Sequence, residues 1–235
     1  MQEFEQKILE QYDIEVSSTR KVRGAVLCET NKGLFLLKEI TTSEKRIPAL
    51  CELYTRLYEQ GYHRIDYVVT NRNGEYISAL DNGDRYILKK CFAGRECDIK
   101  KTREIFEAAG NLAKLHIIMT KEGIATTNFE KFRRDIQVED LYYFLRKVLE
   151  KSGWKIRLGD GMLNAYSAIH PLTEGEMEYL KIRLIYPEKF WKTANSYYCT
   201  NKAWISVKNI EKLQTAIRQT EEKKMFLKEV FGFEL

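Results

Sequence analysis

Lys38 and a carboxylate that follows it are the first candidates for chemistry in this chain. The run from Leu34 to Ile40 is nearly continuous in apolar residues before Lys38, which predicts a β-strand. A helix is predicted soon after it, and Glu52 lies in that helix. A lysine ammonium held in place by a carboxylate can contact phosphate oxygens, so Lys38 and Glu52 would bind the phosphates of a nucleotide. Glu44 is a weaker choice of carboxylate, and a surface lysine without a ligand is the alternative.

The segment from Tyr86 to Cys97 is the second candidate, because it connects two parts of the chain with different patterns. If a nucleotide binds, its adenine ring would meet backbone amides near Cys91 to Ala93. A simple hinge is the alternative. Gly94 supplies backbone freedom, and Arg95 and Glu96 could form an ion pair that fixes the connector without any ligand.

The elements that must position Lys38 form an N-terminal, β-rich lobe over residues 1–91. Short apolar runs separated by turn residues such as Asn31-Lys32-Gly33 predict five antiparallel strands. The strands are Val22 to Thr30, Leu34 to Ile40, Ile65 to Thr70, Glu75 to Leu80 and Tyr86 to Lys90, with a helix from Ser43 to Gln60 inserted after the second. A small sheet that carries one helix, with a lysine in the strand before it, is the arrangement by which kinases hold nucleotide phosphates.

The remaining chain is predicted to be mostly helical, with residues 92–97 as a hinge and residues 98–235 as a second lobe. Apolar residues at helical spacing mark a helix that includes Ile105 and Leu115. Further helices are predicted over Val138 to Lys151, Met162 to Ile169, Glu174 to Tyr186, Phe190 to Thr200 and Asn209 to Phe231. The fold class is therefore α+β, with two lobes.

Composition and charge exclude several classes of function. The 235 residues have a net charge of +5, but acidic and basic residues are interleaved, so no basic patch for nucleic acid is expected. The five cysteines are widely spread and the three histidines offer no obvious partners, so we expect reduced thiols and no metal site. No secretory signal and no apolar run of membrane-spanning length is visible, which predicts a cytoplasmic protein without membrane contact.

Several longer stretches of the chain are more specific than these patterns. They are Cys91 to Cys97, Thr127 to Phe132, Val138 to Lys147, Tyr186 to Lys192, Asn201 to Ile205 and Lys208 to Leu213. Together they resemble the CotS family of spore-coat proteins over essentially the whole chain. That family is similar in fold to aminoglycoside and choline phosphotransferases, so the resemblance implies a two-lobed, kinase-like fold.

The resemblance also implies a catalytic loop that this sequence lacks. Such folds carry a His-Gly-Asp loop, with an Asn five residues after the Asp, between the first long helix of the second lobe and a metal-binding strand. Here Leu112 to His116 resembles the end of that helix, and Ile117 to Ala125 resembles the hairpin after the loop. The second lobe is therefore expected to be truncated internally near His116. Asn128 stands where the family fold usually places a metal-chelating Asp, and Asp135 is interpreted as a helix cap rather than a base.

Two functions remain open from the sequence. The first is a structural or scaffold component of the spore coat that lacks catalysis, contacts other coat proteins or its own copies, and moves from the mother-cell cytoplasm to the coat. The second is a small-molecule kinase of the aminoglycoside or choline phosphotransferase kind, or a pseudokinase that still binds nucleotide. If a cofactor binds, the resemblance implies ATP with Mg²⁺, with Lys38, Glu52, Cys91, Ala93 and Asn128 as the binding residues.

Overall fold

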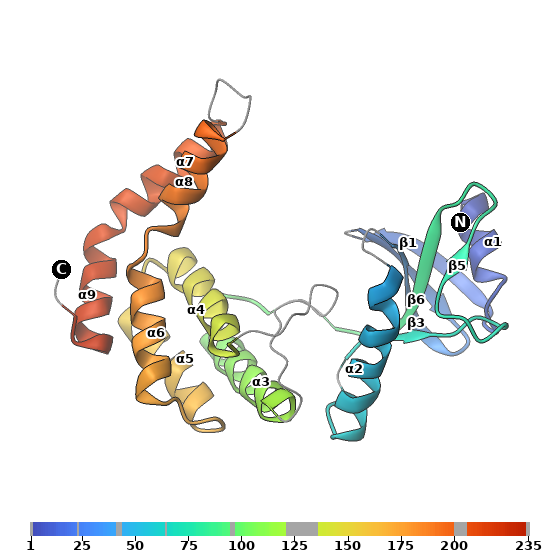
Figure 1. The fold of residues 1–235 in the computed structure, drawn as a ribbon, viewed down its shortest axis with the longest axis horizontal. Helices are drawn as coiled ribbons and strands as arrows, with labels where there is room; N and C mark the ends of the chain where they lie inside the picture. The colour runs from blue at the N-terminus through green and yellow to red at the C-terminus, as the bar shows by residue number, and fades with distance from the viewer. Residues whose placement is uncertain are drawn as a thin grey trace. The chain divides into compact units, whose positions relative to one another are not determined.

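The computed structural model describes residues 2–22, 24–40, 44–63, 65–94, 97–120, 136–199 and 206–233. These residues fall into two compact units, 2–94 and 97–233, shown in Figure 1. The first unit contains the helices α1 (Glu3–Leu9) and α2 (Ile47–Glu59), a short 3₁₀ turn (Glu44–Arg46), and the strands β1 (Val16–Val22), β2 (Ala25–Thr30), β3 (Gly33–Glu39), β4 (Tyr67–Val69), β5 (Ser78–Ala79) and β6 (Arg85–Cys91).

The strands of the first unit form one antiparallel sheet in the order β1-β2-β3-β6-β4, and β5 pairs with β6. One face of this sheet buries Cys28, Phe35, Leu37 and Leu88 against α1 and the turn after it. Alternation along each strand puts the intervening residues on the opposite face, where α2 lies. The predicted α+β class with an antiparallel sheet is confirmed.

The sheet has one strand more than the sequence predicted, because β1 is a separate strand. It buries no residue fully: Val16, Thr19 and Val22 are half-buried and the residues between them are exposed. Among the described strands it pairs with β2 alone, at the edge of the sheet. The turn between β1 and β2 contains Gly24, whose φ of 72° is a conformation that glycine adopts without strain. A polar edge strand gives no apolar run, so the sequence pattern did not reveal it.

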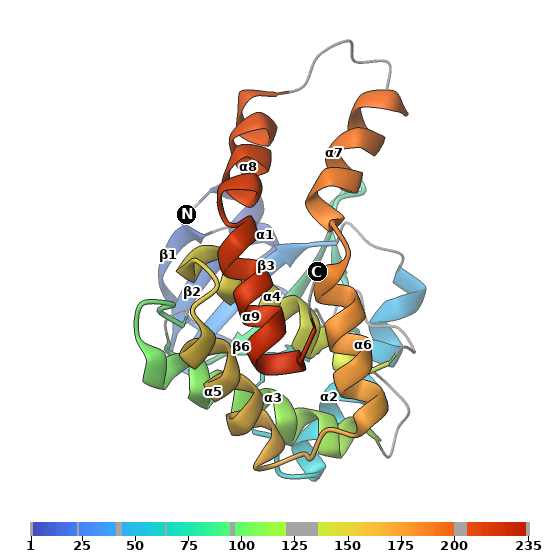
Figure 2. The same cartoon turned by 90° about the vertical axis from the view of Figure 1, so that its left-hand side faces the viewer.

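The second unit consists of helices in the part of the chain that the structure describes (Figure 2). They are α3 (Thr102–Thr120), α4 (Val138–Ser152), α5 (Ile156–Ser167), α6 (Glu174–Ile185), α7 (Glu188–Tyr198), α8 (Val207–Arg218) and α9 (Thr220–Phe231). Their core includes Ile105 of α3, Leu141 and Leu145 of α4, Met162 of α5 and Phe226 of α9, all fully buried. The predicted helical lobe is therefore present.

Two details of the helical unit differ from the prediction. First, α3 continues to Thr120, so Ile117 and the residues after it up to Thr120 are helical rather than the start of a hairpin. The helix continues because Met119 buries its side chain completely, one helical repeat after the buried His116. Second, the single helix predicted up to Phe231 is broken at Gln219 into α8 and α9. The residues predicted as a hairpin from 121 to 125 lie outside the described residues.

No helix of the described residues is long and apolar enough to span a membrane.

Candidate functional site

Strand pairing places Lys38 on the face of the sheet that α2 covers. Lys38 pairs with Ile87 of β6, and Leu36 pairs with Lys89. Paired residues share a face, as do residues two apart on one strand, so Lys38 and Lys89 point to the same side. The Lys89 ammonium lies 5.6 Å from the centre of the Tyr54 ring of α2. Lys38 is therefore on the helix side of the sheet, as a phosphate-binding lysine of the expected kind requires.

The structure does not place Glu52 against Lys38. The Glu52 carboxylate accepts a hydrogen bond from Arg56, one turn further along α2, with a nitrogen–oxygen distance of 2.6 Å. Both side chains of this pair are about half exposed or more. The weaker candidate, Glu44, forms an ion pair with Arg85 at the start of β6. In this conformation both carboxylates therefore have other cationic partners.

The remaining predicted contacts for a nucleotide lie at the end of β6. Cys91 is the last residue of that strand, pairs with Leu34 and is half-buried. Burial raises the pKa of its thiol, with a further contribution from the nearby Asp66 carboxylate. Ala93 is exposed, two residues beyond the strand. Asn128, the predicted metal-side residue, lies outside the described residues, and so do Arg95 and Glu96 of the connector.

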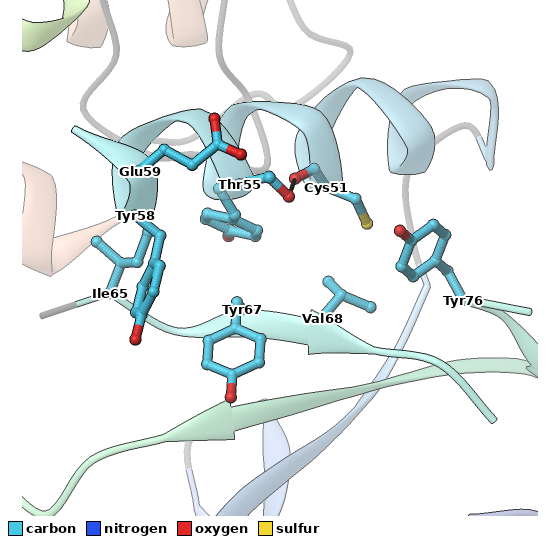
Figure 3. Close-up of a pocket in the computed structure, with 9 residues that line it drawn as sticks. Cys51, Thr55, Tyr58, Glu59, Ile65, Tyr67, Val68 and Tyr76 are labelled. Carbon is cyan, nitrogen blue, oxygen red and sulfur yellow. Dashed lines mark hydrogen bonds between the residues drawn. The ribbon is translucent and has the colours of Figure 1, made fainter. Parts of the chain in front are cut away.

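Figure 3 shows a pocket between α2 and β4 that the sequence analysis did not identify. It has a volume of about 400 Å³, with Tyr58 and Tyr76 towards its two ends and Glu59 as the only charged side chain among the described residues that line it. Burial raises the pKa of the Cys51 thiol in its wall to about 11, so the thiol stays protonated near neutral pH and is a poor nucleophile. The pocket therefore offers aromatic contacts rather than catalytic groups.

The second unit brings three polar side chains together inside its core. His116 of α3 is fully buried, and its Nδ1 lies 2.7 Å from the hydroxyl of Tyr166 on α5. Its Nε2 lies 3.6 Å from Oδ2 of Asp140 on α4, too far for a hydrogen bond. Nε2 of His116 and Oδ2 of Asp140 are both buried, and neither has a hydrogen-bond partner among the described residues. The sequence analysis singled out His116 only as a helix end, because nothing in the sequence connects it to Asp140 and Tyr166.

Among the described residues no three His, Cys, Asp or Glu side chains are grouped in a way that could hold a metal ion.

Comparison with known proteins identifies the family. The family described as "Spore coat putative kinase YutH" matches the chain over residues 5–121 and 119–230. The chain belongs to this family. A curated relative, spore coat protein S of Bacillus subtilis (strain 168), is 37% identical over 95 residues, which are 40% of this chain and 27% of the relative. The aligned region thus spans about a quarter of that relative. The predicted resemblance to spore-coat, kinase-like proteins is confirmed.

Solved structures show the same fold at low sequence identity. An aminoglycoside phosphotransferase from Alicyclobacillus acidocaldarius aligns over 97% of this chain and 95% of its own, with a TM-score of 0.82 and 13% identity. The amicoumacin kinase hAmiN, in complex with AMP-PNP, Ca²⁺ and Ami, aligns over 97% and 93% with a TM-score of 0.62 and 10% identity. A microcompartment-associated aminopropanol kinase aligns over 97% of each chain with a TM-score of 0.53 and 10% identity. The kinase-like fold is therefore established.

Proposed function

We propose that the protein is a kinase-like structural or scaffold component of the spore coat that does not transfer phosphoryl groups. The observation that carries the proposal is the short connection between α3, which ends at Thr120, and α4, which begins at Val138. The connecting residues 121–137 contain no histidine, and their one aspartate, Asp135, follows an arginine rather than a glycine. The connection therefore has no His-Gly-Asp sequence.

The match to the family supports this interpretation, because it consists of two segments that meet at residues 119–121, at the end of α3. Without a base, the hydroxyl that accepts a phosphoryl group is not activated, and without a full set of carboxylates a Mg²⁺ ion is bound weakly. Asn128 would offer an amide oxygen where a carboxylate is expected. Phosphoryl transfer would thus lose both positioning and charge neutralisation.

Two buried polar atoms, Nε2 of His116 and Oδ2 of Asp140, are a second support, because neither has a hydrogen-bond partner in the part of the chain that the structure describes. A buried polar atom that lacks a hydrogen bond costs about 1–3 kcal/mol, so such atoms usually have a partner in a native fold. Both atoms lie in the core of α3 and α4, the two helices that the short connection joins. We infer that a segment missing between these two helices supplied the hydrogen-bond partners that the described residues do not provide.

Exposed apolar side chains support a role in assembly. The helices α7 and α8 expose large apolar side chains such as Trp191 (51%), Tyr198 (80%) and Val207 (71%). Surfaces of this kind often mark protein–protein contacts, so other coat proteins and further copies of the chain are the proposed partners. We propose that the protein is made in the mother cell and reaches the coat through such contacts.

The test measures two properties of the protein, its phosphoryl-transfer activity and its assembly into the spore coat. We expect no release of phosphate from ATP with Mg²⁺ above the background of the buffer, and no transfer to a panel of aminoglycosides and amino alcohols. A fluorescent fusion should localise to the coat and remain in the coat fraction of purified spores. Turnover that depends on Lys38 would refute the proposal, and so would a fusion that stays in the mother-cell cytoplasm.

A second candidate is a pseudokinase that still binds nucleotide, which the position of Lys38 on the α2 side of the sheet favours. A ligand that binds only the folded state stabilises it by about 2.7 kcal/mol at 100 times its Kd, which raises the Tm. If nucleotide binds, ATP with Mg²⁺ raises the Tm of the wild type and of Lys21→Ala, an exposed lysine of β1, but not of Lys38→Ala. The absence of any shift in the wild type would eliminate this candidate and leave the scaffold role.

A further inference from the structure

A second cavity lies in the helical unit, where α4, α9 and the α7 and α8 pair meet. Its volume is about 490 Å³, within the range of about 300–1,000 Å³ that is usual for small-molecule pockets. Apolar side chains from several helices line it, including Trp154, Leu184, Phe190, Leu213 and Ile217. Figure 2 shows α7 continuing beyond α6 and α8 leading into α9. The residues that line the cavity come from these helices, from α4 and from the segment that follows α4. The cavity is thus large enough for an organic molecule with an apolar body.

The two carboxylates that line this cavity already have cationic partners. Glu150 lies 3.1 Å from Arg146 and 3.2 Å from Lys189. Glu188 accepts a hydrogen bond of 2.7 Å from the Tyr142 hydroxyl, lies 3.4 Å from Arg146, and also pairs with Lys192. The carboxylates therefore stabilise the protein's own cations, and they are not available to a ligand that carries a positive charge.

Lys223 of α9 is the cation in this cavity that lacks such compensation. In the part of the chain that the structure describes, no carboxylate lies within 4 Å of its ammonium. The ammonium lies 5.5 Å from the centre of the Trp154 ring and donates a long hydrogen bond of 3.4 Å to the Ile185 carbonyl. Burial lowers the pKa of Lys223 and outweighs the opposing effect of the Glu150 charge, so the fold disfavours the charged form of Lys223. Another wall residue, Gln219, buries its Oε1, which has no hydrogen-bond partner among the described residues.

We propose that this cavity binds an amphipathic organic anion, with the anionic group on Lys223 and the apolar body against Trp154, Phe190 and Ile217. An anion would neutralise a half-buried ammonium that has no carboxylate within 4 Å among the described residues, and the hydrogen bond between them would be charge-assisted. A neutral molecule would leave the free-energy cost of burying the Lys223 charge in place, and a cation would be repelled by Lys223. This inference does not depend on the proposed scaffold role, because it rests on the geometry of α4, α7, α8 and α9 alone.

The test compares two fluorescent probes with the same aromatic body. One is 8-anilinonaphthalene-1-sulfonate, which carries a sulfonate, and the other is N-phenyl-1-naphthylamine, which is neutral. We expect the wild type to bind the sulfonate more tightly than the neutral probe. In Lys223→Met the Kd of the sulfonate should rise about tenfold, the loss of one charge-assisted contact, while the Kd of the neutral probe changes less than about twofold. Lys223→Arg should retain tight binding of the sulfonate.

The control is Lys208→Met, which removes the same charge from α8 at a residue outside the cavity wall. It should bind both probes like the wild type. Ala216→Trp, which fills the cavity from α8, should weaken binding of both probes. Circular dichroism spectra and Tm values identify any variant that fails to fold. Equal affinity of the wild type for the two probes, or a sulfonate Kd that is unchanged in Lys223→Met, would overturn the proposal.

Discussion

Gly159 of α5 is the position where a single added methyl group should most clearly distinguish helix propensity from packing. Glycine inside a helix costs about 1 kcal/mol relative to alanine, so propensity alone predicts that Gly159→Ala stabilises the protein. Gly159 is buried against α9, however. A Cβ at this position would overlap the Phe226 ring, with Cζ at 2.8 Å, and would lie 3.0 Å from Cδ2 of Leu149. Packing therefore predicts that Gly159→Ala destabilises the protein.

The size of the expected loss of stability follows from how little the Phe226 ring can move. Phe226 is fully buried and packs edge-on against Trp154 and Phe231, so the overlap cannot be relieved by turning the ring into solvent. Overpacking of a well-filled core costs about 1–3 kcal/mol, and the gain in propensity offsets about 1 kcal/mol of it. We expect a net loss of about 1 kcal/mol, which lowers the Tm by roughly 2–4 °C in a protein of this size.

The assay is thermal and urea unfolding, followed by circular dichroism, of five proteins: the wild type, Gly159→Ala, Gly175→Ala, Phe226→Leu and the double variant. The control is Gly175→Ala in the first turn of α6, where an added Cβ meets nothing within 4 Å and the Tm should stay the same or rise slightly. In the background of Phe226→Leu, which removes the overlapping ring atoms, Gly159→Ala should cost less than in the wild type. If Gly159→Ala raises the Tm as much as Gly175→Ala does, the close packing of α5 on α9 is refuted.

Two further predictions concern titratable groups. Burial disfavours the charge of Glu188, but hydrogen bonds from Lys192 and Tyr142 and the charge of Arg146 outweigh it and hold the pKa of Glu188 below its usual value. A carboxylate whose pKa is lowered by folding stabilises the protein when the pH is above the unfolded-state pKa of about 4.3, and this stabilisation is lost as the pH falls below that value. Glu188→Gln should therefore show a smaller fall in Tm than the wild type between about pH 5 and pH 3. An equal fall in the two proteins would contradict the lowered pKa of Glu188. Burial also raises the pKa of the Cys28 and Cys51 thiols to about 11, whereas Cys97 and Cys199 are exposed. Mass spectrometry after brief iodoacetamide treatment at pH 8 should find Cys97 and Cys199 modified first, and early modification of Cys28 would show that the sheet is not packed as described.

Local pattern was enough to predict most elements, because strands and helices leave different periods of apolar residues. The apolar run before Lys38 predicted β3, and apolar residues at helical spacing after it predicted α2. The pattern of apolar residues did not reveal elements whose side chains are mostly exposed. Strand β1 is polar because it lies at the edge of the sheet, and α8 buries no side chain fully, so neither its separation from α9 nor the cavity beside it was visible.

The sequence by itself determined the family and the lack of a His-Gly-Asp loop, because both depend on which residues follow one another along the chain. Only the tertiary structure decided which charges meet. The approach of His116 to Asp140 and Tyr166 joins residues of three helices, α3, α4 and α5. In the part of the chain that the structure describes, the lack of a carboxylate within 4 Å of the Lys223 ammonium likewise depends on how α9 packs on α5 and α6, since the nearby carboxylates Glu150 and Glu188 are already paired with other cations. Pairing of this kind depends on distances of a few ångströms between residues far apart in the chain, and the order of residues does not encode those distances locally.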